Sequence, residues 1–200
     1  MYTTLASGAY FQLEPEWIAQ GEARTLFEEL RAELPWVQKT IRMFGKDILE
    51  PRLTVWLGDA EAVYAYSGVV NVPFPMTPAL GALRDRLQLM LDVRFNGVLA
   101  NLYRDGADSM GWHSDDEPEL GANPIIASVS LGAERLFRLA HKKDKADRVD
   151  LRLPHGSLLV MGGTIQTHYR HSVPKTKSAV GERINLTFRR IIGSEASIRT

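Results

Sequence analysis

A histidine and an aspartate two positions apart, His113 and Asp115, are the residues of this sequence best suited to metal chemistry. In an extended strand, side chains at positions i and i+2 point to the same face, so one imidazole nitrogen and one carboxylate oxygen can converge on a single point. These are two of the three groups of the 2-His-1-carboxylate triad, which holds Fe(II) and leaves coordination positions open. A surface polar pair in a loop is the alternative interpretation of so short a pattern.

A third ligand is available downstream, where two histidines lie close together at positions 168 and 171. Either His168 or His171 could complete a site with the first pair, and spacing alone does not choose between them. The metal interpretation therefore depends on whether one of these imidazoles folds back onto His113 and Asp115.

The segment from Arg183 to Arg189 predicts a strand with two chemically different faces. Because strand side chains alternate, both arginines share one face with Asn185 and Thr187, and three apolar residues share the other. An unpaired buried guanidinium is very costly, so the arginine face must meet an anion. An acid of the protein is one candidate. A small dicarboxylate is the other, because the planar fork of arginine matches a carboxylate bidentately.

Composition narrows the class of protein. At 200 residues the chain is most simply one domain, with 44% apolar residues and no cysteine for disulfides, thiolate metal sites or nucleophiles. The formal net charge is zero, from 24 Lys+Arg against 24 Asp+Glu, so binding of nucleic acid would need a local basic patch. No apolar run approaches the length that crosses a bilayer, and no secretory signal is visible. The absence of cysteine is compatible with a reducing, intracellular setting.

Helices are predicted in the first half of the chain and short strands in the second. The acids and proline of Glu14 to Trp17 indicate a helix start, and apolar residues near helical spacing continue to Leu34. Pro78 opens a second helix. This order favours an antiparallel sandwich or jelly roll flanked by N-terminal helices. We expect its strands at 97–103, 125–132, 134–139, 149–153, 158–163 and 184–191.

Two further segments carry aromatic residues that suit either a core or a planar ligand. An alternating segment runs into a glycine turn, where Phe44 sits at the tip before Gly45 and Lys46. Phe44 either folds back onto the core or forms an apolar wedge of the kind that enters a base stack. Tyr64 and Tyr66 share a strand face, which is typical of packing and also of stacking on a planar ligand.

Four segments together resemble the AlkB family of Fe(II)- and 2-oxoglutarate-dependent dioxygenases. In chain order they are Asn101-Leu102-Tyr103, His113-Ser114-Asp115, His171-Ser172-Val173-Pro174 and Arg183 to Arg189. Their combination in this order is specific, whereas any one of them is not. The resemblance covers most of residues 95–192 and, more weakly, 37–70. Three further segments are similar to the eukaryotic members that repair double-stranded DNA, namely Phe44-Gly45-Lys46, residues 64–68 and Asp115-Asp116-Glu117.

The resemblance implies a fold and a domain organisation. The fold is expected to be α+β, a cupin-like double-stranded β-helix (jelly roll) with N-terminal flanking helices and a nucleotide-recognition lid. A single domain would cover residues 1–200, with the helices and the lid in 1–95 and the catalytic jelly roll in 96–192.

Roles for the metal and co-substrate residues follow from the same resemblance. The iron ligands would be His113, Asp115 and His171, with His171 preferred over His168. The distal carboxylate of 2-oxoglutarate would be bound by Arg183, helped by Asn101 and Tyr103. Asn185 and Arg189 would lie toward the metal-side carboxylate.

The resemblance also implies contacts to a flipped base. Tyr66 would stack on that base against the His113 ring, with Tyr64 on the same strand, and Asp116 would approach the edge of the base. The segment Phe44 to Lys46 would act as a finger that fills the gap left by the extruded base.

The implied activity is repair of N-alkylated bases, such as 1-methyladenine and 3-methylcytosine, in DNA or RNA. It would consume O2 and decarboxylate 2-oxoglutarate to succinate. The expected partner is alkylated nucleic acid, with no membrane, a monomeric state, and a location in a bacterial cytoplasm or a eukaryotic nucleus. Two alternatives stay open: a hydroxylase of the same class acting on a protein or a small molecule, and a non-enzymatic jelly-roll binding module.

Overall fold

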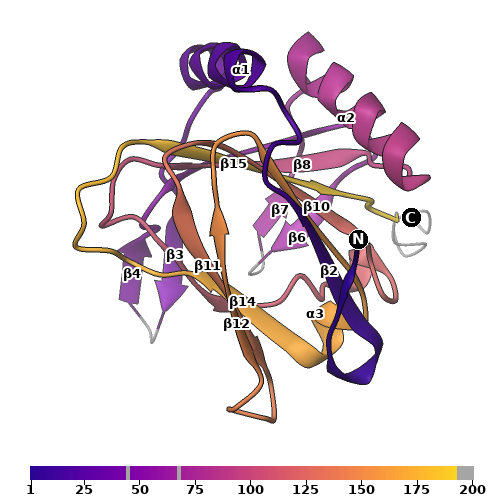
Figure 1. Ribbon diagram of the computed structural model, residues 1–200. Coiled ribbons are helices and arrows are strands. Elements are labelled where there is room, and N and C mark those ends of the chain that lie inside the picture. The colour runs from indigo at the N-terminus through magenta and orange to yellow at the C-terminus, as the bar shows by residue number, and fades with distance from the viewer. Residues whose placement is uncertain (44–45, 67–68, 193–200) are drawn as a thin grey trace.

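Two β-sheets and the helices that cover the larger one make up the fold (Figure 1). The structure, a computed structural model, describes residues 1–43, 46–66 and 69–192. In spatial order, the seven-stranded sheet contains β1 (Thr3–Thr4), β2 (Ala9–Glu14), β13 (Ser157–Gly163), β10 (Ile126–Gly132), β15 (Arg183–Arg189), β8 (Gly97–Tyr103) and β5 (Leu53–Gly58). The four-stranded sheet contains β12 (Arg148–Leu153), β11 (Arg135–His141), β14 (Tyr169–Val173) and β9 (Met110–His113).

Two hairpins lie beside the sheets. They are β3 (Thr40–Met43) with β4 (Lys46–Leu49), and β6 (Tyr64–Tyr66) with β7 (Val69–Asn71). Within each of the two sheets, neighbouring strands pair in antiparallel orientation. Together the sheets form the double-stranded β-helix that the sequence predicts, and the strands expected beyond residue 95 are confirmed to within about two residues.

The second helix, α2 (Pro78–Leu91), follows directly from local chemistry. The Thr77 side chain caps its first turn by accepting a hydrogen bond from the Leu80 backbone N at 3.3 Å, and Pro78 occupies the first helical position, where no N–H is needed. Asp92 ends the helix with φ at 52°, in the left-handed region. The predicted start of this helix is confirmed.

The predicted start of the first helix is wrong. Glu14 ends strand β2 and pairs with Leu158 of β13, and helix α1 begins only at Gln20 and runs to Glu33. Of the residues that indicated a helix terminus, Glu14 belongs to the strand, and Pro15 and Glu16 belong to the connection between the two elements. A short helix, α3 (Ile165–His168), also lies in the second half of the chain, where only strands were expected.

The two faces of β15 separate the core into two layers. Its apolar residues Ile184, Leu186 and Phe188 are fully buried with side chains of α1 and α2, which Figure 1 shows on the same side of the large sheet. Its polar face looks toward the smaller sheet. There, side chains of both sheets, including Tyr103 and Phe137, form a second core. The polar face of β15 therefore lies between the two sheets.

Residues before and after position 95 share one sheet, because β2 and β5 pair with β13 and β8. The division into a lid region and a jelly-roll core stays a prediction. No helix in the part of the chain that the structure describes is long and apolar enough to span a membrane.

Candidate active site

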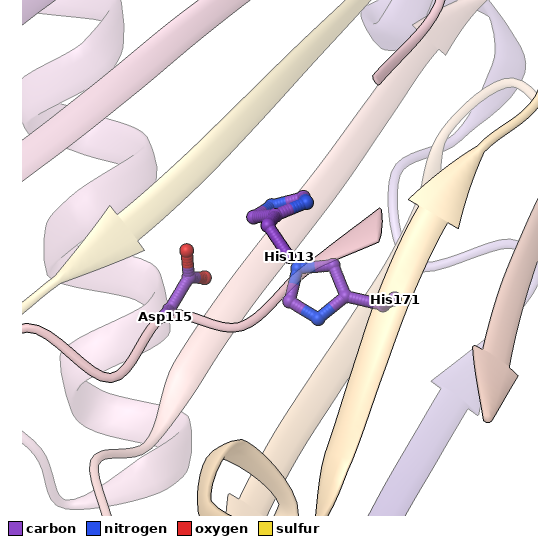
Figure 2. A group of neighbouring side chains, drawn as sticks. All are labelled: His113, Asp115 and His171. Carbon is purple, nitrogen blue, oxygen red and sulfur yellow. The ribbon is translucent and has the colours of Figure 1, made fainter. Parts of the chain in front are cut away.

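Strands β9 and β14 bring two histidines face to face. His113 and His171 occupy directly paired positions of the antiparallel ladder, and their ring centroids are 4.1 Å apart. Asp115 follows β9 by two residues, and one ligand atom of each of the three side chains lies within 4.8 Å of the others. Figure 2 shows all three side chains directed toward a common space. The structure thus brings together the predicted triad.

The alternative ligand, His168, lies elsewhere. It ends helix α3, and its ring stacks on that of His141, with centroids 6.0 Å apart. It is not a member of the His–Asp–His group that the structure describes. Geometry therefore makes the choice between the two histidines that spacing left open.

Local hydrogen bonds orient the triad for a metal ion. His113 Nδ1 lies 2.9 Å from the carbonyl oxygen of Gly111, so a proton on Nδ1 is donated to that carbonyl and Nε2 keeps a lone pair. Oδ1 of the buried Asp115 accepts a hydrogen bond from Arg189 Nη2 at 2.7 Å, and the Asp115 backbone N donates to Gln166 Oε1 at 2.9 Å. Both ligands are held before any ion arrives.

Electrostatics keeps the three groups in the protonation states that a metal requires. Burial lowers the pKa of His171 to about 3, and the neighbouring His113 acts in the same direction. Burial also lowers the pKa of His113, against the opposing effect of Asp115. For Asp115, burial alone would raise the pKa, but the charge of the hydrogen-bonded Arg189 brings it below its usual value. Two neutral imidazoles and one carboxylate result, a nitrogen and oxygen donor set that fits Fe(II).

The two arginines of β15 meet different partners. Arg189 forms the ion pair with Asp115, so a protein acid satisfies this guanidinium. Arg183 is 1% exposed and donates from Nη2 to Ser130 Oγ at 2.9 Å, while its guanidinium carbon lies 5.2 Å from the centre of the Tyr103 ring. Its Nε and Nη1 are buried without a hydrogen-bond partner among the described residues. Burial lowers the pKa of Arg183 to about 10.

These unpaired donors fit a carboxylate ligand. Two adjacent N–H groups of one guanidinium match the two oxygens of a carboxylate, and a buried donor left unsatisfied is costly. Asn101 and Tyr103 lie opposite Asn185 and Arg183 on the paired strand β8. The residues expected around 2-oxoglutarate therefore lie together, although the role of each stays a prediction.

Asn101 and Asn185 are both engaged within the protein. Asn101 Oδ1 accepts from Arg52 Nε at 2.9 Å. Asn185 Nδ2 donates to Ser128 Oγ at 2.7 Å, and its Oδ1 accepts from Thr187 at 3.2 Å. Their contact with a co-substrate would use the remaining hydrogen-bonding capacity of these amides.

Two cavities meet at the triad. The inner one lies between the sheets and is lined by residues that include Asn101, Tyr103, His171 and Asn185. The outer one extends toward the β3–β4 hairpin. The linings of both include Leu99, Met110, His113, Asp115 and Arg189. A metal ion at the triad would thus face a separate space on each side.

Sequence reasoning missed several residues of the outer cavity. Its lining also includes Glu50, Arg52 and Thr54, none of which was singled out from the sequence. Glu50 and Arg52 form a buried ion pair, with 3.1 Å between Oε1 and Nη2. Their i, i+2 spacing across a proline is the only sequence signal, and it resembles any surface charge pair.

The predicted base contacts are placed only in part. Phe44 and Gly45 lie outside the described residues. Lys46 belongs to β4, and Tyr64 and Tyr66 begin and end β6. Asp116 makes an exposed ion pair, its Oδ2 lying 3.2 Å from Lys142 Nζ. These roles stay predictions.

Comparison with known proteins identifies the family. Residues 11–189 match the model of the 2OG-Fe(II) oxygenase superfamily. The chain is 40% identical over 188 residues to the alpha-ketoglutarate-dependent dioxygenase alkB homolog 3 of Homo sapiens, covering 90% of this chain and 65% of that protein. It is also 40% identical over 183 residues to the DNA oxidative demethylase ALKBH2 of Mus musculus, covering 86% of this chain and 77% of that protein. The chain belongs to the AlkB family.

The solved structure of OsALKBH1 has the same fold as this AlkB-family chain. The TM-score is 0.67 with 18% sequence identity, and the match covers 94% of this chain and 100% of the OsALKBH1 chain. The family and the donor set of the triad agree on the cofactors, Fe(II) and 2-oxoglutarate.

Proposed function

We propose that this chain oxidatively removes alkyl groups from nucleic-acid bases, with 1-methyladenine and 3-methylcytosine in DNA as the first substrates to test. The single observation that carries the proposal is the position of the triad between two cavities. The inner cavity is lined by Tyr103, whose ring lies beside Arg183 and its unsatisfied donors, and the outer cavity provides a second space at the triad, which we assign to the base. Relatives named alkB homolog 3 and DNA oxidative demethylase ALKBH2, each 40% identical, support the same activity.

The overall reaction balances without a further reductant. An N-methyl base, O2 and 2-oxoglutarate give the unmethylated base, formaldehyde, succinate and CO2. Fe(II), when held by His113, Asp115 and His171, supplies the activation of O2 that couples decarboxylation of the co-substrate to hydroxylation of the methyl carbon. The hydroxylated product is a hemiaminal on the base nitrogen. For the cationic 1-methyladenine and 3-methylcytosine, it loses formaldehyde and a proton and leaves the unmethylated ring nitrogen with its lone pair.

The protein contributes position and exclusion of water. Arg183 would receive the distal carboxylate on Nε and Nη1, which sets the direction of the co-substrate toward the triad. Arg189 holds Asp115 in a fixed ionised state, so this ligand does not need to reorganise. Phe137 stacks on the His171 ring, with centroids 5.3 Å apart, and is part of the wall of the inner cavity.

A repair assay tests this function. The purified protein, with Fe(II), ascorbate and 2-oxoglutarate, is given oligonucleotides containing one 1-methyladenine, as single-stranded DNA, duplex DNA and RNA. We expect loss of the methyl group by mass spectrometry with one succinate formed for each repair, and none with His171→Ala. Succinate formation that no alkylated oligonucleotide stimulates, but that a protein or small molecule does, would favour the alternative hydroxylase. Absence of turnover with every substrate despite bound iron would favour a binding module.

The proposal includes a monomer and a location. One chain supplies the triad and the lining of both cavities, so no second copy is needed to complete the site. With DNA as substrate, the protein would work where DNA is, in a bacterial cytoplasm or a eukaryotic nucleus.

A further inference from the structure

A buried acid in the outer cavity has one oxygen engaged and one without a partner. Glu50 is 4% exposed, and its Oε1 accepts from Arg52 Nη2 at 3.1 Å. No described group forms a hydrogen bond with its Oε2. A buried anionic oxygen in that state is costly, and such atoms in native proteins call for an explanation such as a bound group.

The carboxylate is held rigidly at this place. The Glu50 backbone N donates to the Lys39 carbonyl oxygen at 2.8 Å, and its own carbonyl oxygen accepts from Gln38 Nε2 at 2.8 Å. Arg52, which holds the side chain, is itself fixed by its 2.9 Å bond to Asn101. Glu50 lines the same cavity as His113 and Asp115, so its carboxylate lies at the wall of the space in front of the triad.

The charges around this cavity make such an oxygen useful. The charged lining residues are three cations, Lys39, Arg52 and Arg189, and three acids, Glu50, Asp115 and Glu117. Asp115 and Glu50 each form a direct ion pair with an arginine, but the pair with Arg52 engages only Oε1 of Glu50. A divalent metal ion would make the site positive, which opposes the entry of a cationic base. A fixed carboxylate oxygen that is not hydrogen-bonded offsets this repulsion.

We propose that Glu50 is the residue that selects positively charged alkylated bases, its Oε2 meeting the cationic edge of the base. This inference rests on the proposed function. 1-Methyladenine and 3-methylcytosine are cations at neutral pH, whereas 3-methylthymine carries its methyl group on the equivalent ring nitrogen and is neutral. Asp116, the acid that the sequence suggested for the base edge, is exposed and paired with Lys142, so its field at a buried base is screened.

Replacement of Glu50 by glutamine tests this selection. Glu50→Gln keeps the size of the side chain and an oxygen for Arg52 but removes the charge. For single-stranded oligonucleotides we expect kcat/KM to fall about 10- to 100-fold with 1-methyladenine and less than about threefold with 3-methylthymine. Glu134→Gln is the matched control, because it removes one charge from an exposed ion pair with Arg152 and should leave both values unchanged.

A structural role for Glu50 predicts a different pattern. If the acid only supports Arg52 and, through it, Asn101, then Glu50→Gln lowers turnover of both bases equally and raises the KM for 2-oxoglutarate. That result would overturn the inference and leave the proposed function standing. Lack of oxidation of any alkylated base by the parent protein would overturn both.

Binding without turnover gives an independent readout. In EDTA, the parent protein should bind an oligonucleotide that contains 1-methyladenine more tightly than the unmethylated strand. In Glu50→Gln, the ratio of the two Kd values should fall at least about tenfold. Glu50→Asp, which keeps the charge, should retain most of it even if repair slows. Equal preference in the parent and Glu50→Gln would refute selection by charge.

Discussion

Replacing Arg183 by methionine should separate the stability of the protein from its affinity for 2-oxoglutarate. Burial lowers the pKa of this guanidinium well below its ordinary value, to about 10, which corresponds to a cost of about 3 kcal/mol for keeping it charged. The group is protonated at neutral pH in both the folded and the unfolded chain, so the folded protein bears this cost below pH 10. The cost is relieved only as pH rises through that value. An apolar side chain of similar length does not bear it.

The free energy of unfolding without ligand should therefore stay level or rise. The lost hydrogen bond to Ser130 removes about 1 kcal/mol, which leaves a net gain of up to about 2 kcal/mol. For a domain of this size that is an increase in Tm of up to about 4–8 °C. This sign is unusual, because most substitutions of buried residues destabilise.

Affinity for 2-oxoglutarate should change in the opposite direction. Two charge-assisted hydrogen bonds, from Nε and Nη1, are worth about 1.5–3 kcal/mol each, so their loss raises Kd about 10²- to 10⁴-fold. In the parent, ligand at about 100 times Kd stabilises the fold by about 2.7 kcal/mol. The same concentration should add almost nothing to the variant.

Thermal unfolding with and without 2-oxoglutarate, with Mn(II) in place of Fe(II) to prevent turnover, measures both effects. Arg135 supplies the control, because this buried arginine already donates to the carbonyl oxygens of Asp105, Asp108 and Pro174. Arg135→Met should lower Tm and keep the ligand-induced shift. A marked loss of Tm in Arg183→Met with an unchanged ligand shift would refute the assignment of Arg183 to the co-substrate.

The remaining predictions concern the triad and the finger. His171→Ala should abolish binding of Mn(II) measured by isothermal titration, and His168→Ala should retain it; the reverse result would mean that the wrong histidine has been assigned. Because burial lowers the pKa of His171 to about 3, the unfolded chain binds a proton at this residue below about pH 6.5 that the folded chain does not. The free energy of unfolding of the metal-free parent should therefore fall, relative to His171→Asn, by about 1.4 kcal/mol per pH unit between about pH 6 and 4, as urea titrations would measure; a constant difference contradicts it. Phe44→Ala should lose repair of duplex DNA while keeping repair of single strands, and equal repair of both by parent and variant would exclude a finger.

The alternating pattern of β15 shows how far sequence reasoning reaches. Alternation placed two arginines on one face, and the cost of an unpaired guanidinium required an anion there. Two candidates stayed open, an acid of the protein or a small dicarboxylate. In the structure, Arg189 forms an ion pair with Asp115, whereas no acid among the described residues forms an ion pair with Arg183. Which arginine meets which anion depends on the tertiary position of Asp115, and strand periodicity carries no information on it.

The Glu50–Arg52 pair and the start of α1 were not predictable for related reasons. Glu50 and Arg52 are close in sequence, but what matters is their burial beside Asn101, 49 positions away from Arg52. The acids and the proline around residue 15 have the composition of a helix terminus, but Glu14 ends a strand that pairs with β13. Local propensity yields to long-range pairing there, as it often does in sheets.

The choice of His171 over His168 depends on strand register. His171 pairs directly with His113, and the ladder between β14 and β9 is irregular immediately afterwards, between His171 and Val173. A shift of β14 by one residue would turn His171 away from His113 and toward the other face of the sheet. Irregularities of this kind commonly lie beside active sites, where they redirect a strand. The same register gives His171 its stacking contact with Phe137. The metal site is therefore specified by the pairing of two short strands as much as by the identity of its three ligands, and a substitution that disturbs that pairing should weaken metal binding without touching a ligand.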